Sequence, residues 1–190
     1  MLKKLVVGVS LLLVAPAALV CGFGRIRWLY GFFAQSYALV PGLPGDYLRI
    51  AFYRLTLELC SLESRVSFGS FFAHPEASLD AGVYIGSYCI LGRVKIGPRT
   101  QIASGVQVLS GKHQHARDAN NRISGSDHGT FTTVSIGADC WIGAAAVVMA
   151  DVGSSTTIGA GAVVTKPIPA NTIAVGNPAR ALEDRKSTDS

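Results

Sequence analysis

Hydrophobic residues follow different patterns in the two parts of this 190-residue chain. In the first part they run almost without interruption: residues 5–20 are nearly all Leu, Val and Ala, and residues 26–40 form a second apolar stretch rich in aromatic side chains. After Arg65 an aliphatic residue instead recurs every six positions, usually followed by a small residue. We therefore expect helices up to about residue 65 and a repetitive all-β structure beyond it.

The six-residue period predicts a parallel β-helix built from hexapeptide repeats, in which three units make one triangular coil. Each aliphatic residue is expected to point inward, and the small residue after it to support the tight corner. The fifth position of a unit is small or β-branched, as a narrow interior requires. The clearest units begin at Leu79, Ile85, Ile96, Ile102, Ile136, Ile142 and Ile158.

The apolar start of the chain predicts membrane association. The run 5–20 is shorter than the roughly 20 residues of a spanning helix, and basic pairs flank it, Lys3 with Lys4 and Arg25 with Arg27. A helix broken at Pro16 that dips into the membrane and returns to the same face accommodates both basic pairs. A spanning helix and a cleaved signal peptide are the alternatives.

Four parts follow from these patterns: a membrane anchor at 1–45, an amphipathic helical linker at 46–65, the β-helix at 66–180, and a polar tail at 181–190. In the linker, residues 46–62 read as a helix capped by Asp46. Its predicted apolar face consists of Leu48, Phe52, Leu55 and Leu59.

Charge and cysteine content narrow the range of partners. The formal net charge is +5, and residues 1–65 contain seven Lys or Arg against three Asp or Glu, which gives four of those five charges. Basic residues beside apolar segments favour anionic membrane lipids. No basic stripe interleaved with aromatic residues appears, so we exclude nucleic acid. The four cysteines form no C-x-x-C pair, and scattered reduced thiols fit a cytosolic location for the catalytic part.

The repeat stops between Val108 and Ile136, where a polar loop at 109–133 replaces it. A long loop leaving a regular solenoid is more often functional than accidental. His74 lies outside the loop and is expected to be structural. The ionisable residues of the loop include Lys112, His113, His115, Arg117, Asp118, Arg122, Asp127 and His128.

Residues 66–183 resemble the hexapeptide-repeat acyltransferases, a family that includes galactoside and serine acetyltransferases. The resemblance is strongest in Cys140-Trp141-Ile142-Gly143, in Ile158-Gly159-Ala160-Gly161-Ala162-Val163-Val164-Thr165-Lys166 and in Gly176-Asn177-Pro178-Ala179-Arg180. The front segment, with Leu43-Pro44-Gly45, resembles the membrane-associated branch that modifies surface polysaccharides. The resemblance implies a left-handed coil and a homotrimer.

The same resemblance implies that a loop histidine is the general base, which removes the proton of an acceptor hydroxyl as that hydroxyl attacks an acetyl thioester. A backbone N–H would stabilise the oxyanion. Gap-free alignment with galactoside acetyltransferase selects His113, whereas the Ser-Gly-x-x-Gln-His pattern of the polysaccharide branch selects His115, which we favour. Lys112, Arg117 and Asp118 are the candidate acceptor-binding residues.

Coenzyme A is expected between coils of adjacent subunits, with acetyl-CoA as co-substrate and no metal. By resemblance, Gly143, Ala144 and Ala160 offer backbone amides to the pantetheine arm. Thr165, Lys166 and Arg180 meet the phosphates and the adenine end, where cationic donors suit the charge.

Together these features predict an O-acetyltransferase acting on a sugar hydroxyl of a lipid-linked or surface polysaccharide, on the cytoplasmic face of a bacterial inner membrane. Sharing a surface with the acceptor would raise its effective concentration. Two alternatives are a membrane-tethered scaffold without catalysis and a γ-type carbonic anhydrase, in which His113, His115 and His128 would bind zinc.

Overall fold

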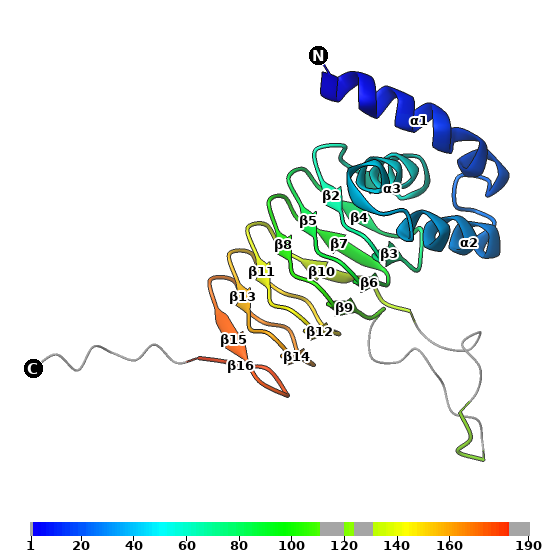
Figure 1. Ribbon diagram of the computed structural model, residues 1–190. Helices are drawn as coiled ribbons and strands as arrows, with labels where there is room; N and C mark the ends of the chain where they lie inside the picture. The colour runs from blue at the N-terminus through cyan, green and yellow to red at the C-terminus, as the bar shows by residue number, and fades with distance from the viewer. Residues whose placement is uncertain (1, 111–119, 124–130, 183–190) are drawn as a thin grey trace, which may run out of the picture.

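The computed structural model describes residues 2–110, 120–123 and 131–182, and it consists of three N-terminal helices packed on one end of a parallel β-solenoid (Figure 1). The helices are α1 (Leu2–Val20), α2 (Arg27–Ala38) and α3 (Gly42–Thr56). Helix α3 lies between α1 and the first coil, and it contacts both. The predicted order of helices followed by a β-solenoid is confirmed.

The solenoid has three sheets, here called A, B and C, and each of the first four coils contributes one short strand to each of them. The later coils enter sheet A through the isolated bridges of Val152 and Ile168. Sheet A contains β1 (Leu59–Cys60), β4 (Ser78–Leu79), β7 (Val94–Ile96) and β10 (Val134–Ile136). Sheet B contains β2 (Arg65–Val66), β5 (Tyr84–Ile85), β8 (Gln101–Ile102), β11 (Trp141–Ile142), β13 (Thr157–Ile158), β15 (Ile173–Val175) and β16 (Arg180–Ala181). Sheet C contains β3 (Phe71–Phe72), β6 (Ile90–Leu91), β9 (Gln107–Val108), β12 (Val147–Val148) and β14 (Val163–Val164).

The strand register confirms the inward aliphatic positions. Ile85, Ile102, Ile142 and Ile158 pair in succession along sheet B, and each is fully buried. The small or β-branched residues at the fifth position of the predicted units are also buried. Burial of one unbroken apolar column per sheet supplies the main driving force for this fold. The handedness of the coil stays a prediction.

The solenoid begins at Leu59, earlier than the predicted boundary at residue 66. This first coil was missed because its inward residues, Cys60, Val66 and Phe72, are each followed by Ser or Ala, so it lacks the Ile-Gly signature. At the opposite end, β16 pairs antiparallel with β15 and covers the edge of the last coil in sheet B.

The corners differ from the prediction in one respect. The glycine after each aliphatic residue is needed for close approach: a Cβ on Gly137 would lie 2.5 Å from the backbone nitrogen of Ser154 in the next coil. The turn itself is made two residues later, where the backbone has positive φ. In the predicted units these turn positions are Gly82, Tyr88, Arg99, Gly105, Asp139, Ala145 and Gly161.

Two helix predictions are wrong. Helix α1 continues through Pro16 instead of breaking there; a proline removes a single backbone donor, and the continuous apolar sequence supports helix on both sides of it. Helix α3 begins at Gly42 and ends at Thr56, so Asp46 is not its cap and Leu59 lies in β1. Pro44 suits the first turn, where no intrahelical N–H is required.

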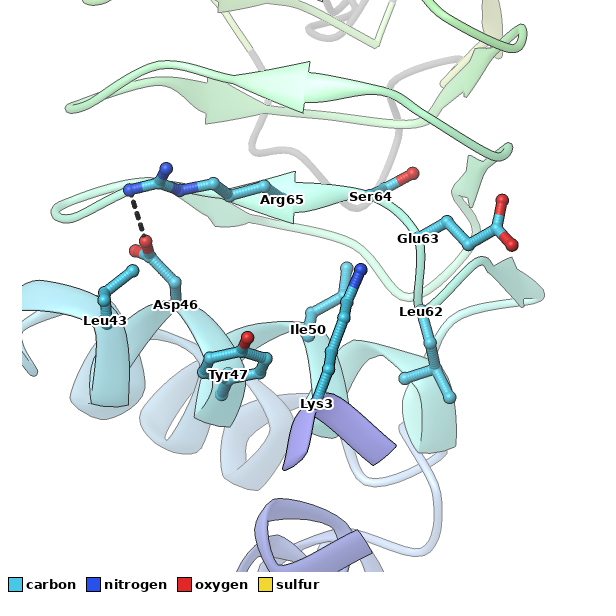
Figure 2. A pocket seen from close by; sticks show the side chains of 9 residues that line it. All are labelled: Lys3, Leu43, Asp46, Tyr47, Ile50, Leu62, Glu63, Ser64 and Arg65. Carbon is cyan, nitrogen blue, oxygen red and sulfur yellow. Dashed lines mark ion pairs between the residues drawn. The ribbon is translucent and has the colours of Figure 1, made fainter. Parts of the chain in front are cut away.

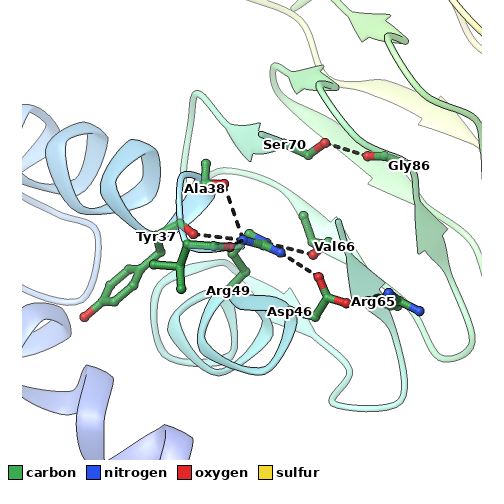
Figure 3. Close-up of polar contacts among 9 residues, drawn as sticks. Tyr37, Ala38, Asp46, Arg49, Arg65, Val66, Ser70 and Gly86 are labelled. Atoms are coloured by element: carbon green, nitrogen blue, oxygen red, sulfur yellow. Dashed lines mark hydrogen bonds and ion pairs between the residues drawn. The ribbon is translucent and has the colours of Figure 1, made fainter. Parts of the chain in front are cut away.

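Arg49 of α3 joins the helices to the solenoid (Figure 3). Its side chain is fully buried. Its guanidinium donates to the carbonyl oxygens of Tyr37, Ala38 and Val40 at the end of α2, at 2.9, 3.4 and 2.7 Å. It also donates to Val66 O at 2.8 Å.

That last contact replaces a missing strand neighbour. Along sheet B each coil donates a backbone N–H to the next, as Ser67 N does to Ile85 O. Val66 O lies in the first coil, which has no coil before it, and Arg49 supplies the donor. In sheet C the hydroxyl of Tyr30 does the same for Phe72 O, at 3.0 Å. The helices thus cap the open edge of the solenoid, which would otherwise expose unpaired backbone groups.

Much of the outer surface of the helices is apolar. Within the described part of the chain, α1 is the helix that is long and apolar enough to cross a membrane, a test that an N-terminal signal sequence also passes. Only 22% of its apolar window is buried. Leu12 and Trp28 are 77% and 74% exposed. An exposed apolar area of this kind marks an interaction surface.

Candidate functional site

The polar loop leaves the solenoid at the edge between sheets C and A, here called the loop edge. It follows β9 of sheet C and leads into β10 of sheet A. The segments 111–119 and 124–130 lie outside the described residues. The predicted bases His113 and His115 therefore are not placed, and neither are Lys112, Arg117, Asp118, Asp127 and His128.

Both ends of the loop are fixed to the solenoid and to each other. Thr132 donates its N–H to Ser110 O at 3.0 Å, which brings the two ends together. The buried Ser110 hydroxyl accepts the N–H of Arg93 at 2.8 Å. A Cβ on Gly92 would lie 2.4 Å from that hydroxyl oxygen. The loop therefore starts and ends at a rigid point of the loop edge.

Beside this point lies a group of side chains that we call the Glu76 cluster: Arg27, His74, Glu76, Arg93 and Phe131. The carboxylate of Glu76 is paired with Arg27 of α2, with one contact of 3.0 Å, and with Arg93 at 3.9 Å. The guanidinium of Arg93 lies over the ring of Phe131, 5.2 Å from its centre, and the ring of His74 lies 5.3 Å from the same ring. The cluster connects the helices to the end of the loop.

The electrostatics of the cluster follow from these contacts. Burial would raise the pKa of Glu76, but the hydrogen bonds and positive charge of Arg27 outweigh it and lower that pKa below its ordinary value. Burial lowers the pKa of His74, and the positive charge of Arg93 lowers it further. A neutral histidine and an ionised glutamate are the expected forms at neutral pH. We expected His74 to be structural; its contact with Phe131 places it next to the end of the loop.

Three of the predicted coenzyme A residues stack at the edge between sheets B and C. Gly143 and Ala160 are in such close contact that a Cβ on Gly143 would lie 2.5 Å from the nitrogen of Ala160. The N–H of Gly161 donates to Ala144 O at 2.8 Å, and Ala144 and Ala160 are both exposed. Gly143 donates its own N–H to Ile158 O at 2.7 Å, so it cannot offer an amide to a ligand as predicted. Ala144 and Ala160 remain the two candidates.

The predicted cationic residues lie at two different edges. Arg180 in β16 pairs with Val175, whose side chain lies beside Gly159, so Arg180 is at the same edge as Ala160. Thr165 and Lys166 follow β14 and lie at the loop edge. Thr165 occupies in its coil the position that Leu109, the first residue of the loop, occupies after β9. In one chain, the predicted donor-binding groups therefore flank sheet C on both sides.

Hollows surround the helices. A pocket of about 250 Å³ lies between α1, α3 and the residues that lead into β2 (Figure 2). Its lining charges are balanced, with Lys3 and Arg65 against Asp46 and Glu63, and Arg65 is paired with Asp46 at 2.6 Å. An apolar groove of about 410 Å³ runs beside it between α1 and α3. A third hollow, of about 420 Å³, lies between the α1–α2 turn, the end of α3 and Pro75-Glu76.

The described ranges contain no group of three His, Cys, Asp or Glu side chains that could hold a metal ion. The three histidines of the zinc alternative lie in the loop segments outside those ranges. All four cysteines are buried and unpaired.

Comparison with known proteins gives partial matches. No protein-family model matches the chain. The colanic acid biosynthesis acetyltransferase WcaF of Escherichia coli (strain K12), as its name describes it, is 33% identical over 103 residues, 52% of each chain. Nodulation protein L of Rhizobium leguminosarum bv. viciae is 40% identical over 107 residues, 54% of each chain. The chain thus spans about half the length of the curated relatives it matches.

Solved structures match a larger share of the fold. The maltose O-acetyltransferase of Clostridium difficile 630 superposes with a TM-score of 0.64 at 23% identity, over 83% of this chain and 87% of that one. A variant of AntD, an N-acyltransferase from Bacillus cereus bound to a dTDP-sugar and coenzyme A, superposes with a TM-score of 0.54 at 18% identity, over 65% and 70% of the two chains. At these identities the likeness concerns the fold alone.

Proposed function

We propose that this protein is an O-acetyltransferase of the hexapeptide-repeat type, which transfers an acetyl group from acetyl-CoA to a sugar hydroxyl. The main support is the similarity to WcaF and nodulation protein L. The solenoid adds to it, because the loop that carries His113 and His115 starts and ends at one rigid point. A likeness of fold to sugar-modifying acyltransferases agrees with this proposal.

In the proposed reaction the acceptor hydroxyl oxygen attacks the thioester carbonyl carbon. A loop histidine, His115 or His113, takes the hydroxyl proton; the carbon–sulfur bond then breaks, and the proton passes to the departing thiolate of coenzyme A. Ala144 and Ala160 are exposed, and within the described ranges their amides donate no backbone hydrogen bond, so either suits the pantetheine arm. Lys166 and Arg180 suit the phosphates of coenzyme A.

Two edges of sheet C carry these groups, so we propose that the complete donor site lies between two copies of the chain in a homotrimer. The outward side chains of sheets B and C favour such packing, because many of them are apolar and stack in rows along each sheet. Sheet C presents Phe71, Ile90, Gln107, Val147 and Val163 in register, and sheet B includes Tyr84, Trp141 and Ile173. In sheet A the outward residues Ser78, Lys95 and Ser135 are polar, and Leu59 is apolar.

We further propose that the helices bind the cytoplasmic face of a bacterial inner membrane and that the acceptor is lipid-linked or part of a surface polysaccharide. The exposed apolar side chains of α1 and α2, together with the exposed Lys3 and Lys4, support contact with anionic lipid. An enzyme that modifies a lipid-linked saccharide gains effective concentration from binding the same surface.

The test is release of thiol from acetyl-CoA by the full chain in detergent, with a panel of lipid-linked saccharides, for wild type and the variants His113→Ala, His115→Ala and His128→Ala. We expect His113→Ala or His115→Ala to lose at least about a hundredfold in kcat, the size of a general-base contribution, while still binding coenzyme A. His128→Ala, a matched change in the same loop, should remain active.

The outcomes separate the alternatives. Stoichiometric zinc that is bound by the wild type and lost in all three variants would favour the carbonic anhydrase alternative. A wild-type protein that neither binds coenzyme A nor releases thiol with any acceptor would overturn the proposal in favour of a scaffold.

A further inference from the structure

We infer that the hollow beside the α1–α2 turn, here called the turn cleft, forms with the Glu76 cluster a binding site for a pyranoside acceptor. The inference rests on the proposed function, because it assigns the acceptor of the same reaction to a place on the molecule.

The turn cleft lies on the side of the helices that Glu76 and Arg93 connect to Phe131 at the end of the loop. It is bounded by residues 23–27, by the end of α3 and by Pro75-Glu76. Glu76 belongs both to the wall of the cleft and to the Glu76 cluster. Within the cluster it pairs with Arg93, whose guanidinium lies over the ring of Phe131. A continuous surface therefore leads from the α1–α2 turn, where Phe23 is 50% exposed, to the base of the loop.

The cleft is built into the fold rather than left by loose packing. Gly24 has φ +93°, and a Cβ there would lie 2.7 Å from Thr56 O and 2.9 Å from Pro75 Cβ. This contact closes the turn against the solenoid. The N–H of Glu58 donates to Pro75 O at 3.3 Å and fixes the opposite wall. The volume of about 420 Å³ is within the range of small-molecule sites.

The polar groups of the site suit a sugar. Arg25 and Glu58 are exposed and have no ion-pair partner among the described residues. Guanidinium groups donate and carboxylates accept, and a sugar hydroxyl needs both kinds of partner. Phe23 at one end and Phe131 at the other offer apolar rings to the C–H faces of a pyranose.

The charges favour a neutral or weakly anionic saccharide. Arg25, Arg27 and Arg93 oppose Glu58 and Glu76, which leaves a single positive charge. The pocket of Figure 2 is a less suitable place for the acceptor, because it lies at the edge between sheets A and B, away from the loop edge.

The experiment measures acetyl transfer to octyl glucoside, octyl galactoside and octyl N-acetylglucosaminide by the full chain in a phosphocholine detergent, and coenzyme A binding separately by calorimetry. The variants are Arg25→Gln and Glu58→Gln. The matched controls are Arg54→Gln and Glu63→Gln, which change exposed residues of the same types outside the cleft.

For the best acceptor we expect each cleft variant to raise KM about tenfold, the loss of one charge-assisted hydrogen bond. The kcat and the affinity for coenzyme A should stay within about twofold of wild type, as should all constants of the two controls. An unchanged KM in both cleft variants would overturn the inference. So would a wild type that binds coenzyme A but acetylates none of the glycosides. A wild type without coenzyme A binding would instead overturn the proposed function.

Discussion

Replacing Arg49 by methionine tests whether the helices are an integral cap of the solenoid. Methionine fills similar space but donates no hydrogen bond. Five hydrogen bonds of the guanidinium would be lost: four to backbone carbonyls and one to Asp46 at 2.6 Å. We expect a large loss of stability because the site is fully buried.

The magnitude follows from the partners left behind. Tyr37 O keeps the N–H of Val40, and Ala38 O keeps the N–H of Gly69. Asp46 keeps Arg65, at 2.6 Å. The buried Val66 O and the partly buried Val40 O then lack this donor, and an unsatisfied buried group costs about 1–3 kcal/mol. A loss of about 3–5 kcal/mol is therefore expected, in the range for breaking a buried ion pair.

Thermal unfolding in one detergent measures this effect. For a chain of this size about 3–5 kcal/mol corresponds to a fall in Tm of roughly 6–20 °C. Arg49→Lys keeps the charge but has fewer hydrogen-bond donors, so its Tm should lie between those of wild type and Arg49→Met. Arg54→Met, an exposed change on the same helix, should stay within about 2 °C, since such surface changes are usually small. A Tm for Arg49→Met within that margin would refute the view that Arg49 closes the solenoid edge.

Three further predictions concern the coils, the charges and the assembly. Gly143→Ala should destabilise by about 1–3 kcal/mol, because its Cβ would lie 2.5 Å from backbone of the next coil, whereas Gly31→Ala, with open space around it, should be neutral or stabilising in chemical unfolding. The lowered pKa of Glu76 means that its ion pairs stabilise the fold above its ordinary pKa of 4.5 and lose this effect as the pH falls further; Glu76→Gln should flatten that part of the pH–stability curve. Val147→Arg on the outer face of sheet C should dissociate the proposed trimer in sedimentation, and Ser135→Arg on sheet A should not.

The repeated part of the fold could be predicted because its information is local and periodic. An inward aliphatic residue at every sixth position determines burial, strand and register together, as the stacked Ile85 and Ile102 show. The first coil lacked this signal. The predicted limits of α3 depended on Asp46, which resembles a helix cap in sequence. In space its side chain pairs with Arg49 of the same helix and with Arg65 of β2. No spacing rule predicts a partner that the fold brings from another element.

The candidate site could be predicted only in part for the same reason. The small residues at 143, 144 and 160 follow from the repeat, yet the use of the Gly143 N–H within the coil shows only in the structure. The Glu76 cluster combines α2, the first two coils and the end of the loop. These five residues come from four separate segments and give no pattern along the sequence.

The division of the predicted donor groups between two edges has a consequence for activity. Ala160 and Arg180 lie on one side of sheet C, and Lys166 and the loop lie on the other, with an apolar strand ladder between them. If a second copy covers that ladder, one edge of each chain faces the opposite edge of its neighbour, and the two half-sites form one donor site. A substitution in the middle of the ladder, such as Val147→Arg, should then abolish acetyl transfer and weaken coenzyme A binding, although Val147 is not among the predicted donor-contacting residues. Retention of full activity by a monomeric variant would show that one chain holds the whole site.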